Sequence, residues 1–397
     1  MGYPKTGESS RNVPLSVERP AVAVFPHPRR VVRGPPQKRV ASMAALALPA
    51  FVLVLFAGSR WIPGRSVPAA VTDGTGERRT YRLNGGRLFT LSVCAVVSCR
   101  FLAPRVLVWP HRHWAELLVV ANVFAFALAF LLFRSGRRRA PEASRASGWR
   151  RGVADYFRGV ELNPEWAGVD LKFFSYRPSL IGLFVFNASA AAAQVAEQGS
   201  LSGRMLLYQI FFFVYLANYF QFEGGMIHTW DLVAERFGWG LVWGDYVLVP
   251  FFYGIAGRVL VDVRTPLPPW QGAVCCAVFV FGFWLFRGAN GQKHRFRSGG
   301  TVTVWGRPAE TLDGRLLVSG FWGIGRKLNY TGELLVYLAW TLLCGTASVL
   351  PYLLPLFLLV LFVHRAHRDD RRCRAKYGPL WDEYCRRAPF RMFPFVY

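Results

Sequence analysis

The stretch "GFWGIGRKLNYTGE" at residues 320–333 concentrates side chains that could bind an anion or transfer a proton. Arg326 and Lys327 could contact phosphate groups, because their donors form charge-assisted hydrogen bonds with phosphate oxygens. Asn329 adds an amide, and Glu333 adds a carboxyl that could act as an acid or base. The same residues could also mark the start of a membrane helix, and "NYT" is a formal glycosylation sequon.

Gly323 and Gly325 have the spacing that begins a G-x-G-x-x-G dinucleotide fingerprint. Position 328 is leucine, and an apolar segment follows where a strand–helix unit should lie. The stretch is therefore not a Rossmann turn. Glycosylation is also disfavoured, because Arg326 and Lys327 mark the positively charged, non-lumenal side of the membrane.

Ionisable residues also lie at the edges of the two apolar runs that follow. Glu333 begins the first run. The second ends in five titratable residues: Arg365, His367, Arg368, Asp369 and Asp370. Charges at membrane depth are costly and by default functional, although interfacial arginines and a solvated charge run would look similar. The four-residue spacing of Arg365 and Asp369 predicts an ion pair on one helix face. Asp369 is also a candidate catalytic residue, because charges at membrane depth are by default functional.

A second group of carboxyls lies among aromatic residues in "TWDLVAERFGWGLVWGDYVLVPFFYG" at 229–254. It contains Asp231, Glu235 and Asp245, and Glu223 precedes it. In dry surroundings a carboxyl is more easily kept protonated, as a general acid requires. Glu223 and Tyr253 are therefore the further candidates for the catalytic acid, although some of these groups could be satisfied core residues.

The composition indicates that membrane helices position these groups. Of the 397 residues 53% are hydrophobic, and Lys plus Arg exceed Asp plus Glu by 48 to 23. Such an excess can reflect nucleic-acid binding, but here the basic residues flank apolar runs, as the positive-inside rule predicts. We therefore expect a lipid-membrane protein and no nucleic-acid partner. The seven cysteines have no spacing that suits a metal.

Nine apolar segments are candidates for membrane helices, each of which needs about 20 apolar residues. They are residues 41–58, 87–104, 114–133, 179–197, 205–222, 239–262, 270–288, 331–347 and 349–363. The last two are short and could form a tight hairpin. The sequence thus predicts an all-α, polytopic membrane protein with about nine or ten transmembrane helices.

The segments outside these runs are basic. Residues 1–40 contain seven prolines and eight Lys or Arg, typical of a disordered basic arm. Three other regions should face the cytoplasm: 134–152, 290–320 with a short β-like hairpin, and the tail after His364. Polar groups beside apolar runs are densest in the last third of the chain, so we expect the site there.

Five blocks resemble, in order, the integral-membrane sterol reductase family of Δ14-, Δ7- and Δ24(28)-reductases and the lamin B receptor. The blocks are "GVELNP" with "DLKFFSYRPSLIG", "RFGWGLVWGDYVLVPFFY", "GANGQKHRFR", "LLVSGFWGIGRKLNYTGELL" and "HRAHRDDRRCRAKYGPLWDEYCRRAPFRMFPFVY". The resemblance is strong over 150–397 and rests on hydropathy over 41–150. It implies a reductase domain at 41–397 with a cofactor-binding part at 290–397.

The resemblance implies NADPH-dependent reduction of a double bond in a bilayer sterol, in the endoplasmic reticulum (the inner membrane in a bacterium). The cofactor pocket would lie in the C-terminal half and face the cytosol. The implied cofactor-binding residues are Lys293, Arg297, Leu317, Trp322, Asn329, Tyr330, Arg365, Asp369 and Tyr377. The Δ14 bond is the first expectation. Features such as "TVTVWGR" and "TWD" leave the Δ7 and Δ24(28) bonds open, and a non-catalytic sterol-binding or scaffold protein is the alternative from another class.

Overall fold

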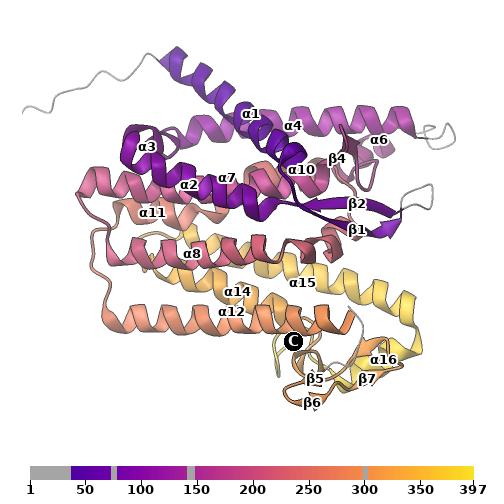
Figure 1. Cartoon of the computed structure of the whole chain (residues 1–397). Coiled ribbons are helices and arrows are strands. Elements are labelled where there is room, and N and C mark those ends of the chain that lie inside the picture. Colours follow the sequence, from indigo (N-terminus) through magenta and orange to yellow (C-terminus); the bar gives the residue numbers. More distant parts are fainter. Residues whose placement is uncertain (1–36, 73–77, 141–147, 298–302) are drawn as a thin grey trace, which may run out of the picture.

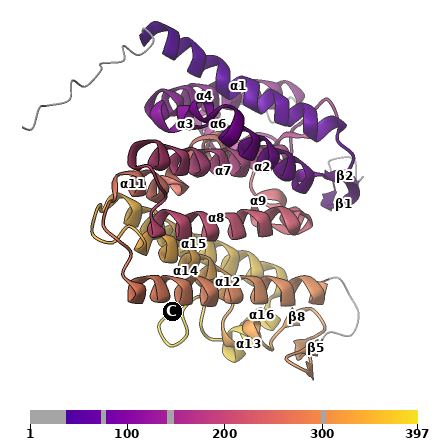
Figure 2. The same cartoon turned by 60° about the vertical axis from the view of Figure 1, so that its left-hand side comes forward.

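A computed structural model describes residues 37–72, 78–140, 148–297 and 303–397. The predicted basic arm at 1–40 lies almost wholly outside these residues. Within them the chain is mostly helical, and the long helices lie side by side in stacked layers (Figures 1 and 2).

Seven segments of the described chain are long and apolar enough to cross a membrane, as expected of a multi-pass membrane protein. They are Met43–Trp61, Gly85–Leu102, Trp114–Arg139, Leu171–Gln198, Trp239–Asp262, Pro269–Arg297 and Leu350–Tyr377. Two other predicted spans form helices, α8 (Gly203–Gln221) and α14 (Leu328–Leu342), that lie outside this group. Length and composition therefore support fewer crossings than the nine or ten predicted.

The described residues of the N-terminal part form five helices and one hairpin. Its elements are α1 (Gln37–Trp61), β1 (Arg65–Thr72), β2 (Arg78–Leu83), α2 (Gly85–Leu102), α3 (Pro104–Arg112), α4 (Trp114–Arg139) and α6 (Trp149–Arg158). Strands β1 and β2 pair antiparallel. Three shorter two-stranded sheets lie further along the described chain. The described fold is therefore mostly helical, as predicted, with small hairpins between helices.

Helix α7 (Leu171–Gln198) is the most deeply buried of the seven spans and forms the centre of the molecule. The Oδ1 of Asp170 accepts a 2.8 Å hydrogen bond from the backbone N–H of Phe173, which caps its start, and Gly199 ends it in the left-handed conformation. The neighbouring elements are β3 (Glu165–Trp166), β4 (Val169–Asp170), η1 (Glu223–His228), α9 (Trp230–Val233), α10 (Trp239–Trp243), the π-helix η2 (Gly244–Tyr253) and α11 (Ile255–Asp262).

The C-terminal part supplies most of the predicted site residues. Its elements are α12 (Pro269–Arg297), β5 (Thr303–Val304), β6 (Arg307–Pro308), β7 (Thr311–Leu312), β8 (Leu316–Leu317), α13 (Phe321–Ile324), α14, α15 (Leu350–Tyr377) and α16 (Pro379–Arg387). The strand pairs β5–β6 and β7–β8 confirm the hairpin character predicted for 290–320. Helix α15 continues well past His364, so the start of the predicted tail is helical.

Helices α12 and α14 approach closely because each presents a glycine to the other. A Cβ added at Gly332 would lie 2.4 Å from the backbone nitrogen of Phe286, and one at Gly282 would lie 2.6 Å from the Cβ of Leu335. Small residues allow such close helix contact in membrane proteins. Gly332 belongs to the "NYTGE" motif, so one of its functions is to set the spacing of α12 and α14.

The basic regions gather at one end of the bundle. In Figure 1 the β1–β2 hairpin, α6, the strands β5–β8 and α16 all lie at the right-hand end, whereas α3 lies at the other. This arrangement agrees with the prediction that residues 134–152, 290–320 and the C-terminal tail share one side of the membrane.

Candidate active site

Lys293, near the end of α12, lies with its ammonium 4.5 Å from the centre of the Trp322 ring. Trp322 is buried in α13, and its Nε1 donates a 2.8 Å hydrogen bond to the backbone oxygen of Ala289. Neither Lys293 nor Arg297, one turn further along α12, forms an ion pair with any described carboxylate. Two basic side chains that have no carboxylate partner in the described part of the chain are suited to an anionic ligand.

Asn329, on the first turn of α14, faces α12. Its Nδ2 donates to the Oδ1 of Asn290 at 3.3 Å, while its own Oδ1 is buried and has no hydrogen-bond partner within the described residues. A buried acceptor left without a donor is costly, so a donor on a bound ligand would stabilise this arrangement. The adjacent Tyr330 stacks on Phe362 of α15, with ring centres 4.9 Å apart.

Lys327 and Asp369 form an ion pair that joins the start of α14 to α15. Burial alone would lower the pKa of Lys327, but the Asp369 carboxylate raises that pKa above its ordinary value, so Lys327 stays charged. Lys293 lies close enough to act electrostatically on both. The junction of α12, α14 and α15 therefore holds two lysines and one carboxylate.

The predicted ion pair between Arg365 and Asp369 is wrong. The Nη2 of Arg365 lies 2.7 Å from the Oδ1 of Asp231 in α9, and Asp369 pairs with Lys327 instead. Residues four apart share a helix face, but each can have a better-placed partner on another element.

Helix α9 is held against α7 and α15. The Nζ of Lys172 on α7 donates to three backbone oxygens of the α9 segment, at 2.6 to 3.2 Å. Glu235, just after α9, pairs with Arg368 at 2.7 Å and accepts a 2.6 Å hydrogen bond from the Trp230 indole. These contacts present the Asp231 carboxylate to Arg365.

An open groove with a volume of about 490 Å³ lies beside α9. Its lining residues are Leu162, Trp230, Val233, Ala234, Arg236 and Arg372. Arg372 is three residues beyond Asp369, so the groove brings solvent to within one helical turn of that carboxylate.

The C-terminal segment folds back beneath the start of α14. The backbone N–H groups of Arg326 and Lys327 donate to the backbone oxygens of Phe390 and Arg391, at 2.9 and 2.6 Å. The hydroxyl of Tyr384 on α16 donates a 3.0 Å hydrogen bond to the backbone oxygen of the buried α13 tryptophan. The tail thus holds the "GFWGIGRKLNYTGE" stretch at Trp322 and at the Arg326–Lys327 pair.

A tyrosine cluster, made of Tyr215, Tyr253, Glu333 and Tyr337, lies deeper in the bundle. The Tyr215 hydroxyl donates to the Oε1 of Glu333 at 3.2 Å and lies 2.8 Å from the hydroxyl of Tyr337. The ring of Tyr253 meets that of Tyr337 edge-on, with centres 5.3 Å apart. Arg365 and Glu333 lie within electrostatic range of Tyr253, so the cluster adjoins the Arg365–Asp231 pair.

Glu223 lies in a different environment. Its carboxylate pairs with Arg177 at 2.9 Å, accepts from the backbone N–H of Gly85 at 2.9 Å, and accepts from the Tyr176 hydroxyl. All these groups are buried, and together they join α2, α7 and η1. A carboxylate bound by an arginine and two further donors favours a structural role.

The other predicted residues surround the junction at greater distances. Leu317 packs in the same buried apolar cluster as Trp322. Arg297 is the exposed last residue of α12. Tyr377, two turns beyond Asp369, packs on Trp381 with ring centres 6.3 Å apart.

Four residues of the site were not predicted: Tyr215, Tyr337, Asn290 and Trp230. Each lies in or beside an apolar run, where a tyrosine, tryptophan or amide resembles an ordinary core residue. One signal was available, because Tyr337 follows Glu333 by four residues and so shares its helix face.

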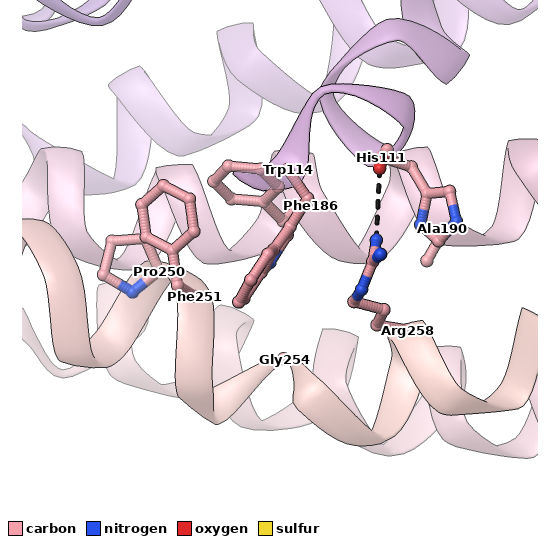
Figure 3. Close-up of a pocket in the computed structure, with 8 residues that line it drawn as sticks. All are labelled: His111, Trp114, Phe186, Ala190, Pro250, Phe251, Gly254 and Arg258. Carbon is pink, nitrogen blue, oxygen red and sulfur yellow. Dashed lines mark hydrogen bonds between the residues drawn. The ribbon is translucent and has the colours of Figure 1, made fainter. Parts of the chain in front are cut away.

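A small pocket lies toward the opposite end of the bundle, between α3, α7 and the η2–α11 segment (Figure 3). The Nη1 of Arg258 donates a 3.2 Å hydrogen bond to the backbone oxygen of His111 and lies over the Trp114 ring. Burial, and then the Arg258 charge, lower the pKa of His111 to about 4. With a volume of about 10 Å³ the pocket is only large enough for one water molecule, so it is not a substrate site.

The fold and site define a multi-pass membrane protein with a cationic junction and a buried tyrosine cluster between its C-terminal helices. The chain belongs to the Ergosterol biosynthesis ERG4/ERG24 family, which it matches over residues 39–397. This finding confirms the resemblance to membrane sterol reductases.

Its relatives include reductases of two sterol bonds. The chain is 38% identical over 353 residues to "Delta(14)-sterol reductase" of Arabidopsis thaliana, covering 87% of this chain and 95% of the relative. It is 38% identical over 345 residues to "Delta(14)-sterol reductase" of Methylotuvimicrobium alcaliphilum, covering 85% of this chain and 79% of the relative. Identity to "7-dehydrocholesterol reductase" of Xenopus laevis is 29% over 357 residues, covering 84% of this chain and 75% of the relative.

Proposed function

We propose that this protein reduces the Δ14 double bond of a sterol, with NADPH as the reductant. The observation that carries the Δ14 assignment is the 38% identity to Δ14-sterol reductases from a plant and a bacterium, against 29% to a 7-dehydrocholesterol reductase. The Δ7 and Δ24(28) bonds are the alternative substrates.

The residues present at the junction fit a phosphorylated dinucleotide. Lys293 and Arg297 have no carboxylate partner among the described residues, and the buried Oδ1 of Asn329 has no donor. Lys293 and Arg297 would contact phosphate groups, Asn329 would accept from the ligand, and Trp322 and Leu317 would form an apolar wall. When bound, the cofactor supplies a hydride.

Reduction of a carbon–carbon double bond by a hydride also needs a proton, which adds to the other alkene carbon. Tyr253 is the proposed donor, because it lies in the tyrosine cluster beside Arg365 and Glu333. Glu333, hydrogen-bonded to Tyr215, is the second candidate. Asp369 forms an ion pair with Lys327, so its proposed catalytic contribution is to hold Lys327 at the junction where the cofactor would bind.

We further propose that α8 and α14 cross the membrane together with the seven longer spans, giving nine crossings. The hydrogen bond from Tyr215 to Glu333 joins α8 to α14 and satisfies polar groups that would otherwise be left unpaired inside the membrane. An endoplasmic reticulum location, with the basic end of the bundle in the cytosol, is the proposed setting.

Expression in yeast strains that each lack one sterol reductase tests this function. We expect the chain to remove the Δ14-unsaturated sterol that accumulates in the Δ14-deficient strain, as measured by mass spectrometry of extracted sterols. Correction of only the Δ7 or Δ24(28) defect would move the assignment to that bond. Failure to correct any strain, with the protein present in the membrane, would favour the non-catalytic sterol-binding alternative.

A further inference from the structure

Helix α6 carries an exposed apolar stripe at the basic end of the bundle. Trp149, Val153 and Phe157 follow one another at four-residue spacing, so they share one helix face. Their exposed fractions are 75%, 46% and 45%, although α6 is only ten residues long. Large apolar side chains in a continuous exposed stripe usually mark a membrane or protein contact.

The stripe is continuous with a surface that already faces lipid. Phe157 packs edge-on against Trp239, and Trp239 lies 5.4 Å from Phe126 on α4. Phe126 and its neighbours on this span, such as Val119 and Val123, are exposed, as expected for a lipid-facing helix. The apolar stripe of α6 therefore extends the lipid-facing surface of α4 to its basic end.

The other sides of α6 carry positive charge. At 100° per residue Arg150 flanks the stripe, and Arg151 and Arg158 lie on the opposite side. All three are exposed, and none forms an ion pair with the described part of the chain. The one acidic residue of α6, Asp155, is already paired with Arg137 at 3.3 Å.

We propose that α6 lies in the headgroup layer of the membrane and binds anionic phospholipids through Arg150, Arg151 and Arg158. Trp149 and Val153 enter the boundary with the acyl chains, where tryptophan is favoured. A basic residue near an anionic membrane surface strengthens binding by roughly fivefold, so three should contribute on the order of 100-fold. The site is independent of the sterol and cofactor sites.

The test uses the full-length protein in a neutral detergent, titrated with fluorescent phosphatidylserine or phosphatidylcholine in mixed micelles. We expect the wild type to bind phosphatidylserine more tightly. In the R150Q/R151Q/R158Q variant the ratio of phosphatidylserine affinity to phosphatidylcholine affinity should fall at least tenfold, with an unchanged Tm. The matched control R100Q/R105Q/R264Q removes three exposed arginines from the opposite end of the bundle and should leave the preference unchanged.

Two further arms separate the possible ligands. The W149Q/V153Q variant should weaken binding of both lipids, because it removes the apolar contact. Soluble phosphoserine should compete poorly, since it lacks acyl chains. Equal loss of the phosphatidylserine preference in the two arginine variants would overturn the proposal. Full competition by phosphoserine would also overturn it and would indicate a site for free anions. Full competition by a polyglutamate peptide would overturn it as well and would indicate a site for an acidic protein.

Discussion

Asp369 is the residue whose environment most changes its predicted role. It pairs with the buried Lys327 rather than with Arg365, and Lys293 lies nearby. Asp369→Asn keeps the shape and removes the charge. It should lower kcat/KM about 100-fold, because Lys327 is no longer held in position at the junction. It should also destabilise the fold by about 1.5–3 kcal/mol, because a charged hydrogen bond is lost and Lys327 keeps its charge.

Steady-state kinetics and thermal unfolding of the Asp369→Asn variant measure these effects. Adding Lys327→Met should restore part of the lost stability but none of the activity, because it removes the unpaired charge and not the defect at the site. Wild-type turnover in a folded single variant that binds NADPH normally would reduce the ion pair to a structural contact.

Tyr253 and Glu223 were both predicted as candidates for the catalytic acid. Their surroundings now favour a catalytic role for Tyr253 and a structural role for Glu223. Tyr253→Phe should lower turnover at least 100-fold with little change in Tm or in NADPH binding, because only the proposed proton donor is lost. Glu223→Gln should instead destabilise the protein by about 3–5 kcal/mol, since it leaves the buried Arg177 without its partner. The opposite pattern, a stable inactive Glu223 variant and an active Tyr253 variant, would exchange their roles.

At the scale of elements, the contact between α12 and α14 positions the site. Lys293 and Asn290 lie on α12, Asn329 and Glu333 on α14, and the backbones approach at Gly332. Gly332→Ala should therefore separate the helices and weaken NADPH binding as well as stability. Gly291→Ala is the matched control on α12, because its Cβ would meet only the flexible end of Arg295 at 3.6 Å. Equal, small effects of both variants on NADPH binding would show that the close contact is not needed.

How far these elements could be predicted depended on sequence separation. The apolar runs, the hairpin character of 290–320 and the convergence on the C-terminal helices follow from local patterns. The partners did not: Arg365 and Asp231 are 134 positions apart, and Lys327 and Asp369 are 42 apart. Helical spacing identifies residues on one face, but only packing between helices determines which charges meet.

At the scale of the whole molecule, the basic end of the bundle should face the cytosol. A tag at Tyr397 should be removed by protease added to sealed microsomes, and a tag in the 134–152 loop should be removed with it, because both lie at that end. Protection of the Tyr397 tag would invert the proposed orientation and place the cofactor junction on the side without NADPH.

If the cationic junction binds NADPH and the tyrosine cluster donates the proton, the protein should reduce a sterol Δ14 bond in purified form. Purified protein in lipid nanodiscs, supplied with a Δ8,14-diene sterol, should convert it to a product heavier by two hydrogens when NADPH is present. NADH should be much less effective, and Lys293→Ala/Arg297→Ala should raise the KM for NADPH and narrow the difference between the two cofactors. A folded protein that forms no NADPH-dependent product from the diene would contradict this account, whether it reduces a Δ7 sterol instead or reduces no sterol at all.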